Sequence, residues 1–215
     1  MSKLAATIDY TLLKPTAGTA EVEGLCQTAI DRGYAAVCVW PLFAEMAADL
    51  LHEGDVRVAA VAAFPHGAVP LAMKLAELQD LRRNGATEAD VVWNLPAFHE
   101  GEYRQLEREL HALAYVAREE GLLLKVIIET GLMTSDEQLQ AAARLCAEAE
   151  VGFVKTSTGW LGPGAAVGTV RRLRELLPGP VGIKASGGIR TRAAAQELVD
   201  AGATRIGTSA DLLAE

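Results

Sequence analysis

Two lysines in this 215-residue sequence stand where an amine could act as a nucleophile. Lys155 ends an apolar run over residues 151–154 and opens the small polar stretch KTSTG. This pattern is typical of a buried strand that leads into a loop. Burial disfavours the charged ammonium, so such a lysine would have a lowered pKa and a reactive neutral amine. A strand lysine that keeps its amine in water has the same local pattern.

A second stretch of this kind, PVGIKASGGIR over residues 180–190, ends its apolar part on Lys184. The chain contains only six lysines, so two of them finish strands with a buried pattern. If both amines face one pocket, each raises the cost of charging the other. Lysines activated in this way form Schiff bases with carbonyl compounds, and Schiff-base chemistry is therefore the leading hypothesis.

Asp90 lies inside an apolar stretch, EADVVWN over residues 88–94. A carboxylate within such a strand is costly unless a cation pairs with it. Because two candidate lysines are available, we favour a role in proton transfer, directly or through a water, during carbinolamine formation and C–C cleavage. The alternative is a structural ion pair with Lys184 or an arginine.

Two turns of small residues, SGGIR (186–190) and GTSA (207–210), predict a phosphate site. Gly187 and Gly188 would let backbone amides approach an anion, and Arg190 could add charge. A glycine pair is more often only a tight turn. Its place after the seventh expected strand favours phosphate, since barrels often bind phosphate between the loops after strands seven and eight.

The histidines lack the HxH or HExxH spacing of a metal site, so we expect no metal ion and no other cofactor. They are His52, His66, His99 and His111. The tryptophans lie at or just past expected strand ends, at Trp40, Trp93 and Trp160. Each one alone would ordinarily pack in the core, but together they could narrow the opening of a site.

Composition excludes several classes of protein. A net charge of −8 argues against a nucleic-acid partner. No apolar run approaches the roughly 18 residues that span a bilayer, and the N-terminal residues predict no secretory signal. Three widely spaced cysteines without a CxxC pair predict a reduced, cytoplasmic protein.

Strand-like and helix-like segments alternate along the whole chain. Strands are expected over 7–13, 35–40, 56–64, 89–94, 122–130, 152–156, 180–186 and 204–209, and helices over 19–31, 41–51, 69–84, 101–120, 135–148, 165–177 and 191–201, with a short helical tail. The strands are nearly continuous apolar runs, which is typical of a parallel sheet covered on both faces. Eight such units predict a single-domain (β/α)8 TIM barrel over residues 1–215, and a doubly wound open sheet is the alternative.

Active sites of such barrels lie at the carboxyl ends of the strands. Polar residues gather at or near these ends: Asp9, Cys38, Asp90, Asn94, Glu129, Lys155, Lys184 and Ser209.

Taken together, these motifs resemble the deoxyribose-phosphate aldolases, a family of class I aldolases. The matching stretches run in family order: IDYTLLKP (8–15), VCVWP (37–41), FPHG (64–67), EADVVWN (88–94), KVIIET (125–130), GFVKTSTG (152–159), IKASGGIR (183–190) and RIGTS (205–209). The resemblance implies a (β/α)8 barrel that reversibly cleaves 2-deoxy-D-ribose 5-phosphate to D-glyceraldehyde 3-phosphate and acetaldehyde. It implies no metal, and a cytoplasmic homodimer or higher homo-oligomer.

Carried over by position, the resemblance makes Lys155 the Schiff-base nucleophile, Lys184 the second lysine that lowers its pKa, and Asp90 the proton donor and acceptor. It assigns contacts with the substrate hydroxyls to Asp9, Thr11 and Thr158, and the phosphate to Gly159, Gly187, Gly188 and Ser209. Cys38 matches a cysteine that lines the family's pocket, without a role that we assign.

The sequence departs from the family pattern at Tyr10, Trp40, His66, Trp93, Trp160 and Ala210, and it ends early, so we expect no tail residue to assist proton abstraction. These changes leave the lysine chemistry intact but bear on substrate range. Two other functions fit the residues: a sugar-phosphate isomerase or epimerase in which Lys155 only binds phosphate, and a non-catalytic phosphosugar-binding protein.

Overall fold

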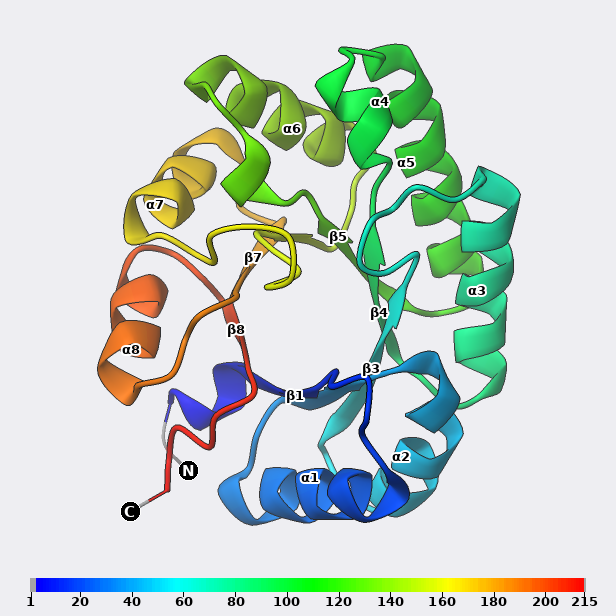
Figure 1. The fold of residues 1–215 in the computed structure, drawn as a ribbon, viewed down its shortest axis with the longest axis vertical. Helices are drawn as coiled ribbons and strands as arrows, with labels where there is room; N and C mark the ends of the chain where they lie inside the picture. Colours follow the sequence, from blue (N-terminus) through cyan, green and yellow to red (C-terminus); the bar gives the residue numbers. More distant parts are fainter. Residues whose placement is uncertain (1–2, 215) are drawn as a thin grey trace.

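The computed structural model describes residues 3–214, in which eight parallel strands close into a barrel in sequence order. The strands are β1 (Ile8–Leu12), β2 (Ala36–Val39), β3 (Arg57–Ala62), β4 (Glu88–Val92), β5 (Leu123–Ile127), β6 (Phe153–Lys155), β7 (Gly182–Ser186) and β8 (Arg205–Thr208). They form an inner ring surrounded by helices (Figure 1). Because β1 pairs with β8, the sheet has no open edge, and the predicted TIM barrel is confirmed over the doubly wound alternative.

The helices connect successive strands on the outside of the barrel. They are α1 (Thr19–Arg32), α2 (Ala44–Leu51), α3 (Leu71–Arg83), α4 (Leu95–His99), α5 (Tyr103–Glu119), α6 (Asp136–Glu148), α7 (Val167–Leu176) and α8 (Arg192–Asp200), with three short 3-10 helices at Ala5–Thr7, Pro41–Phe43 and Thr130–Leu132. None of the helices within residues 3–214 is both long and apolar enough to cross a membrane.

One short helix was not expected, and one local expectation was wrong. The segment before α5 contains its own short helix, α4, because the Asn94 side chain accepts a hydrogen bond from the Ala97 amide and caps it. The expected helical tail after β8 is a turn instead. There Asp211 accepts hydrogen bonds from Arg32 and Tyr34, which anchor the tail to the end of α1.

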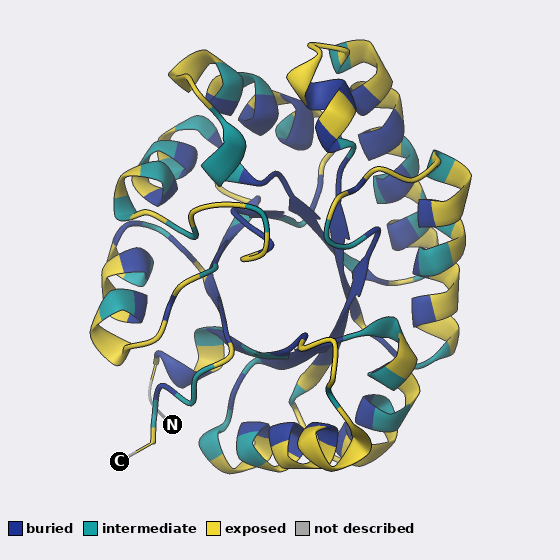
Figure 2. Cartoon of the chain, in the orientation of Figure 1, coloured by how far each residue is buried: buried dark blue, intermediate teal, exposed yellow. Residues whose placement is uncertain are grey.

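The main hydrophobic core lies between the barrel and its helices, which are buried on their inner faces and exposed outside (Figure 2). In α5, for example, Leu106, Leu110 and Leu113 recur at helical spacing and are fully buried. The long apolar strands are thereby covered on their outer face, as the sequence pattern predicts.

Strand register decides which side chains share the barrel interior. Lys155 is paired in register with Lys184, and Lys184 with Arg205, while Asp90 is paired with Lys125. Residues paired in this way on neighbouring strands point to the same face of the sheet. The barrel interior is therefore charged on the side of β4 to β8. Its apolar side consists of Leu13 just after β1, Cys38 on β2, and Ala59 and Val61 on β3.

Candidate active site

Lys155 and Lys184 bring their amines to one carboxylate oxygen. The Lys155 Nζ lies 2.8 Å and the Lys184 Nζ 2.7 Å from Oδ2 of Asp90. All three side chains are buried, and only Lys155 reaches the pocket above them. The prediction that both lysines face the same site is confirmed, and the ion pair between Asp90 and Lys184 coexists with the contact to Lys155.

Asp90 is a carboxylate at neutral pH. Burial alone would raise its pKa, but Lys125, Lys155 and Lys184 outweigh burial and hold the pKa well below its usual value. Its Oδ1 atom accepts a hydrogen bond from Lys125 at 2.7 Å, so both oxygens have cationic donors. In the resting site Asp90 can therefore accept a proton, and it can donate one only after it has received it.

Asp9 lies below the pocket together with Asp90 and Lys184. Its side chain is fully buried and is not among the side chains that line the pocket. It bonds instead to Lys184, at 2.5 Å, and to Arg205. Burial would raise the pKa of Asp9, but Lys184, Lys125 and Arg205 lower it to about 2. Asp9 thus orients Lys184 from below.

Three further buried charges belong to this cluster and were missed in the sequence. Lys125 contacts Glu88 at 2.6 Å, and Glu88 in turn contacts Arg205 at 2.8 Å. A signal for Glu88 existed, because it lies two residues before Asp90 and side chains alternate along a strand. Lys125 interrupts an apolar run and Arg205 opens β8, but both precede the strand ends where chemistry was expected.

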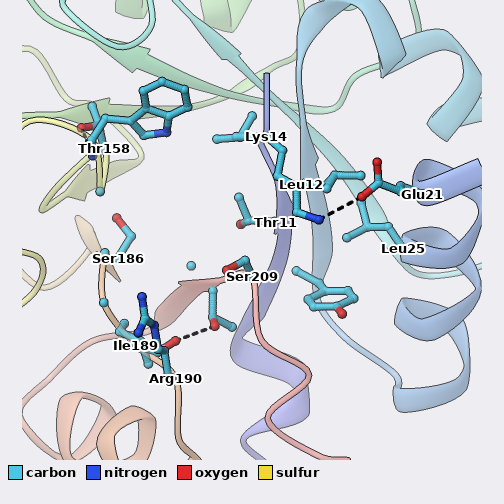
Figure 3. Close-up of a pocket in the computed structure, with 18 of the residues that line it drawn as sticks. Thr11, Leu12, Lys14, Glu21, Leu25, Thr158, Ser186, Ile189, Arg190 and Ser209 are labelled. Atoms are coloured by element: carbon cyan, nitrogen blue, oxygen red, sulfur yellow. Dashed lines mark hydrogen bonds and ion pairs between the residues drawn. The ribbon is translucent and has the colours of Figure 1, made fainter. Parts of the chain in front are cut away.

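The pocket above Lys155 has a volume of about 750 Å³ and opens at the carboxyl ends of the strands. Thr11, Thr158, Ser186 and Ser209 border it from four different parts of the chain (Figure 3). The predicted binding residues Gly159, Gly187 and Gly188 line it as well. The structure therefore brings every predicted site residue to the pocket or, in the case of Asp9, Asp90 and Lys184, below it.

The glycine turn after β7 needs its glycines. Gly187 and Gly188 have φ values of 89° and 76°, which L side chains rarely adopt. A Cβ on Gly187 would also lie 2.8 Å from the Gly164 Cα, so the turn packs against the loop after β6. Arg190 borders the pocket from the same turn, on the exposed side.

The loop that follows Lys155 is held in place by Glu129. This residue adopts a φ of 52°, and its buried Oε2 accepts a hydrogen bond from the Thr158 amide at 2.9 Å. The loop then extends over the barrel opening (Figure 1). Its Trp160 ring lies 6.1 Å from that of Trp40 and 6.0 Å from that of Phe64, in edge-to-face contacts.

Trp93 does not take part in this narrowing of the opening, contrary to the sequence expectation. It is fully buried and packs on Phe98 of α4, with ring centroids 4.5 Å apart. Cys38 lies beneath the aromatic rings, with its Sγ 3.8 Å from Asp90 Oδ2. Burial and the Asp90 carboxylate raise the pKa of this thiol, so it stays protonated at neutral pH.

A buried lysine amine on a pocket floor, beside a carboxylate and a second lysine, is the arrangement of an amine nucleophile. Residues 4–210 match the family described as DeoC/LacD family aldolase. The chain belongs to this aldolase family.

Several relatives of this aldolase are similar over nearly their whole length. It is 47% identical over 209 residues to the deoxyribose-phosphate aldolase of Thermosynechococcus vestitus, covering 97% of this chain and 94% of that protein. It is 43% identical over 208 residues to the deoxyribose-phosphate aldolase of Thermococcus gammatolerans, covering 96% and 92%. The tetrameric deoxyribose phosphate aldolase structure from Aeropyrum pernix aligns with a TM-score of 0.89 and 37% identity, over 96% of this chain and 86% of that one.

Proposed function

We propose that this aldolase is a class I enzyme that reversibly cleaves 2-deoxy-D-ribose 5-phosphate to D-glyceraldehyde 3-phosphate and acetaldehyde. The observation that carries the proposal is the Lys155 amine, which lies on the pocket floor 2.8 Å from the Asp90 carboxylate. The names of the relatives support the choice of substrate. Every step uses side chains of the protein, so the proposal requires no metal ion and no other cofactor.

Cleavage would start when the neutral Lys155 amine attacks the aldehyde carbon of the open-chain sugar. The nitrogen then loses a proton to Asp90, which returns it to the carbinolamine hydroxyl, and this hydroxyl leaves as water to give the protonated imine. The Asp90 carboxylate next takes the proton of the C3 hydroxyl, directly or through a water, the C2–C3 bond breaks, and its electron pair forms the C1–C2 double bond of the enamine. Protonation at C2 and hydrolysis release acetaldehyde and restore the amine.

The surrounding residues would divide the work of binding. Thr11 and Thr158 would contact the substrate hydroxyls, while Gly159, Gly187, Gly188 and Ser209, which line the same pocket, would hold the phosphate. Lys184 stays charged, because Asp9 and Asp90 outweigh the effect of burial and raise its pKa. A fixed cation there would oppose protonation of Lys155 and would help to move protons to and from Asp90.

Borohydride trapping tests this mechanism. The enzyme is incubated with acetaldehyde and reduced with sodium borohydride, and its peptides are then examined by mass spectrometry. We expect an ethyl group on Lys155, and none on that peptide in a Lys155→Met variant that retains its circular dichroism spectrum and no longer cleaves the substrate. An unmodified Lys155 in an enzyme that still cleaves the sugar phosphate would overturn the Schiff-base mechanism.

The same experiment separates the other two functions. A sugar-phosphate isomerase would convert its substrate without any label, and a binding protein would bind the sugar phosphate with neither label nor turnover. The position of Lys155 favours the aldolase, because its amine contacts Asp90 at the floor of the pocket rather than the glycine turns that would hold phosphate.

We also propose that the enzyme is a cytoplasmic homo-oligomer acting on small molecules. The Aeropyrum pernix relative is tetrameric, and Cys26, Cys38 and Cys146 are buried thiols without a disulfide in the part of the chain described. Light scattering coupled to size-exclusion chromatography would measure the oligomer, and a monomeric mass at micromolar concentration would contradict this proposal.

A further inference from the structure

The pocket floor rests on a closed set of buried charges. Its carboxylates are Asp9 on β1 and Glu88 and Asp90 on β4, and its cations are Lys125 on β5, Lys155 on β6, Lys184 on β7 and Arg205 on β8. The remaining strands, β2 and β3, add the Cys38 thiol and apolar side chains, and the one charged residue at the start of β3 is Arg57. Arg57 touches Glu88 from the far end at 3.3 Å, but its side chain is 57% exposed, so water screens its charge.

Lys125 and Glu88 form the layer beneath Asp90. The Lys125 amine lies 2.6 Å from Glu88 Oε2, 2.7 Å from Asp90 Oδ1 and 3.8 Å from Asp9 Oδ2. Neither Lys125 nor Glu88 lines the pocket or touches Lys155. Their influence on the reacting amine must therefore pass through Asp90 and through the field of their charges.

The formal charges of this set sum to zero only when the Lys155 amine carries no proton beyond its neutral form. Three carboxylates face Lys125, Lys184 and Arg205, and these six groups already sum to zero. The fourth cation would be Lys155, which would leave one uncompensated positive charge in a buried site. An unbalanced buried charge is costly, so the set is most stable when the Lys155 amine is neutral.

The six other groups keep their charges at neutral pH. Burial opposes ionisation of each, but the opposite charges around them outweigh it. The pKa values of Asp9, Glu88 and Asp90 are lowered, and those of Lys125, Lys184 and Arg205 are raised. Lys155 is also the only cation of the set that lines the pocket, so it is the one that can exchange protons with substrate or water there.

We infer that Lys125 and Glu88 are positioning residues that set the protonation state of Lys155 through the charge balance of the buried set. This inference rests on the proposed function, in which Lys155 is the nucleophile. It goes beyond that function because it assigns a role in reactivity to two residues that contact neither the substrate pocket nor the reacting amine.

The inference predicts opposite effects for two substitutions. Lys125→Met removes a cation, so the Lys155 ammonium is favoured and a higher pH is needed to release the free amine. The acid limb of the kcat/KM profile then moves to higher pH. Glu88→Gln removes an anion and moves the same limb to lower pH. We expect shifts of about 1 to 3 pH units, the range that a single nearby charge produces.

Two further variants control for damage to the fold. The double variant Lys125→Met with Glu88→Gln restores the balance, so its acid limb returns toward the wild-type position. Lys74→Met makes the same substitution at a buried lysine outside the barrel, where the amine contacts Glu109 at 2.8 Å and the Val92 carbonyl at 2.9 Å. This variant loses stability without a shift in the profile.

The readouts are the pH dependence of kcat/KM and the pH dependence of borohydride trapping of acetaldehyde on Lys155. Shifts in the same direction for both single variants, or no shift in a folded Glu88→Gln variant, would overturn the inference. If Lys125→Met does not fold, Glu88→Gln still decides, because loss of structure cannot improve activity at low pH. Absence of trapping in the wild-type enzyme would instead overturn the proposed function.

Discussion

One side of the barrel interior is lined by charged side chains and the other by apolar ones. On β4 to β8 and β1, the interior holds carboxylates, lysines and an arginine that pair with one another. On β2 and β3, it holds Cys38, Ala59 and Val61, with Trp40 and Phe64 above them. The same strand geometry supports both sides, so the difference lies entirely in the side chains that register directs inward.

The contrast shows why the charged side is reactive. An apolar wall on one side keeps water out and lowers the local dielectric constant, so each charge on the other side acts more strongly on its neighbours. The Lys155 amine contacts Asp90 on the charged side and is therefore subject to the balance of those charges. The apolar side thus contributes to reactivity without providing a reacting group, and three predictions test this division of roles.

The largest effect is expected for Asp90→Asn. The substitution preserves size but removes the proton acceptor shared by Lys155 and Lys184, so kcat should fall by about 10²- to 10⁴-fold. Stability should fall by about 3–5 kcal/mol as well, because buried cations lose their partner. Steady-state kinetics and urea unfolding measure the two effects.

Asp200→Asn, on the exposed surface of α8, is the matched control and should change neither turnover nor stability. Near-wild-type turnover of Asp90→Asn would remove Asp90 from the mechanism.

An effect of intermediate size is expected from acid, which should lower the free energy of unfolding by protonating Asp9. The pKa of Asp9 is lowered from 3.8 to about 2, so its ion pairs stabilise the fold fully above pH 4 and are lost as the pH falls toward 2. The Asp9 contribution is about 2 kcal/mol, from the shift alone. Urea unfolding at a series of pH values between 6 and 2 measures this loss, and Asp9→Asn should be less stable at pH 6 and show a shallower decline. An equally steep decline in that variant would assign the acid sensitivity to other groups.

The smallest effect on activity is expected for Val61→Thr, which places a hydroxyl on the apolar side. Its cost is that of burying a hydroxyl without a designed partner, about 1–3 kcal/mol of unfolding free energy. Activity per folded enzyme and its pH profile should stay unchanged, because the substitution adds no titratable group, although Val61 is paired in register with Asp90. Val69→Thr, at a partly exposed position, is the control and should be neutral. A shifted pH profile of kcat/KM in Val61→Thr would mean that the apolar side also affects the protonation of the reacting groups.

Much of the site could be predicted before the fold was seen. Lys155, Lys184 and Asp90 stand out because a charge that interrupts an apolar run near a strand end must find a partner in a barrel. The alternation of strand and helix patterns predicts the barrel itself. The local differences have local causes: Asn94 caps a short helix in a stretch where no element was expected, and Asp211 accepts hydrogen bonds that hold the expected helical tail in a turn.

What the sequence by itself determined is the class of fold, the order of its strands and the residues with the chemistry of an amine nucleophile, because periodicity and buried charge are properties of short stretches. Tertiary structure alone decided which charges meet. Register and barrel closure placed Asp9 under Lys184 and below the pocket, joined Lys125 and Glu88 to Asp90, and sent Trp93 into the core. These outcomes depend on how strands distant in sequence align, and no local pattern contains that alignment.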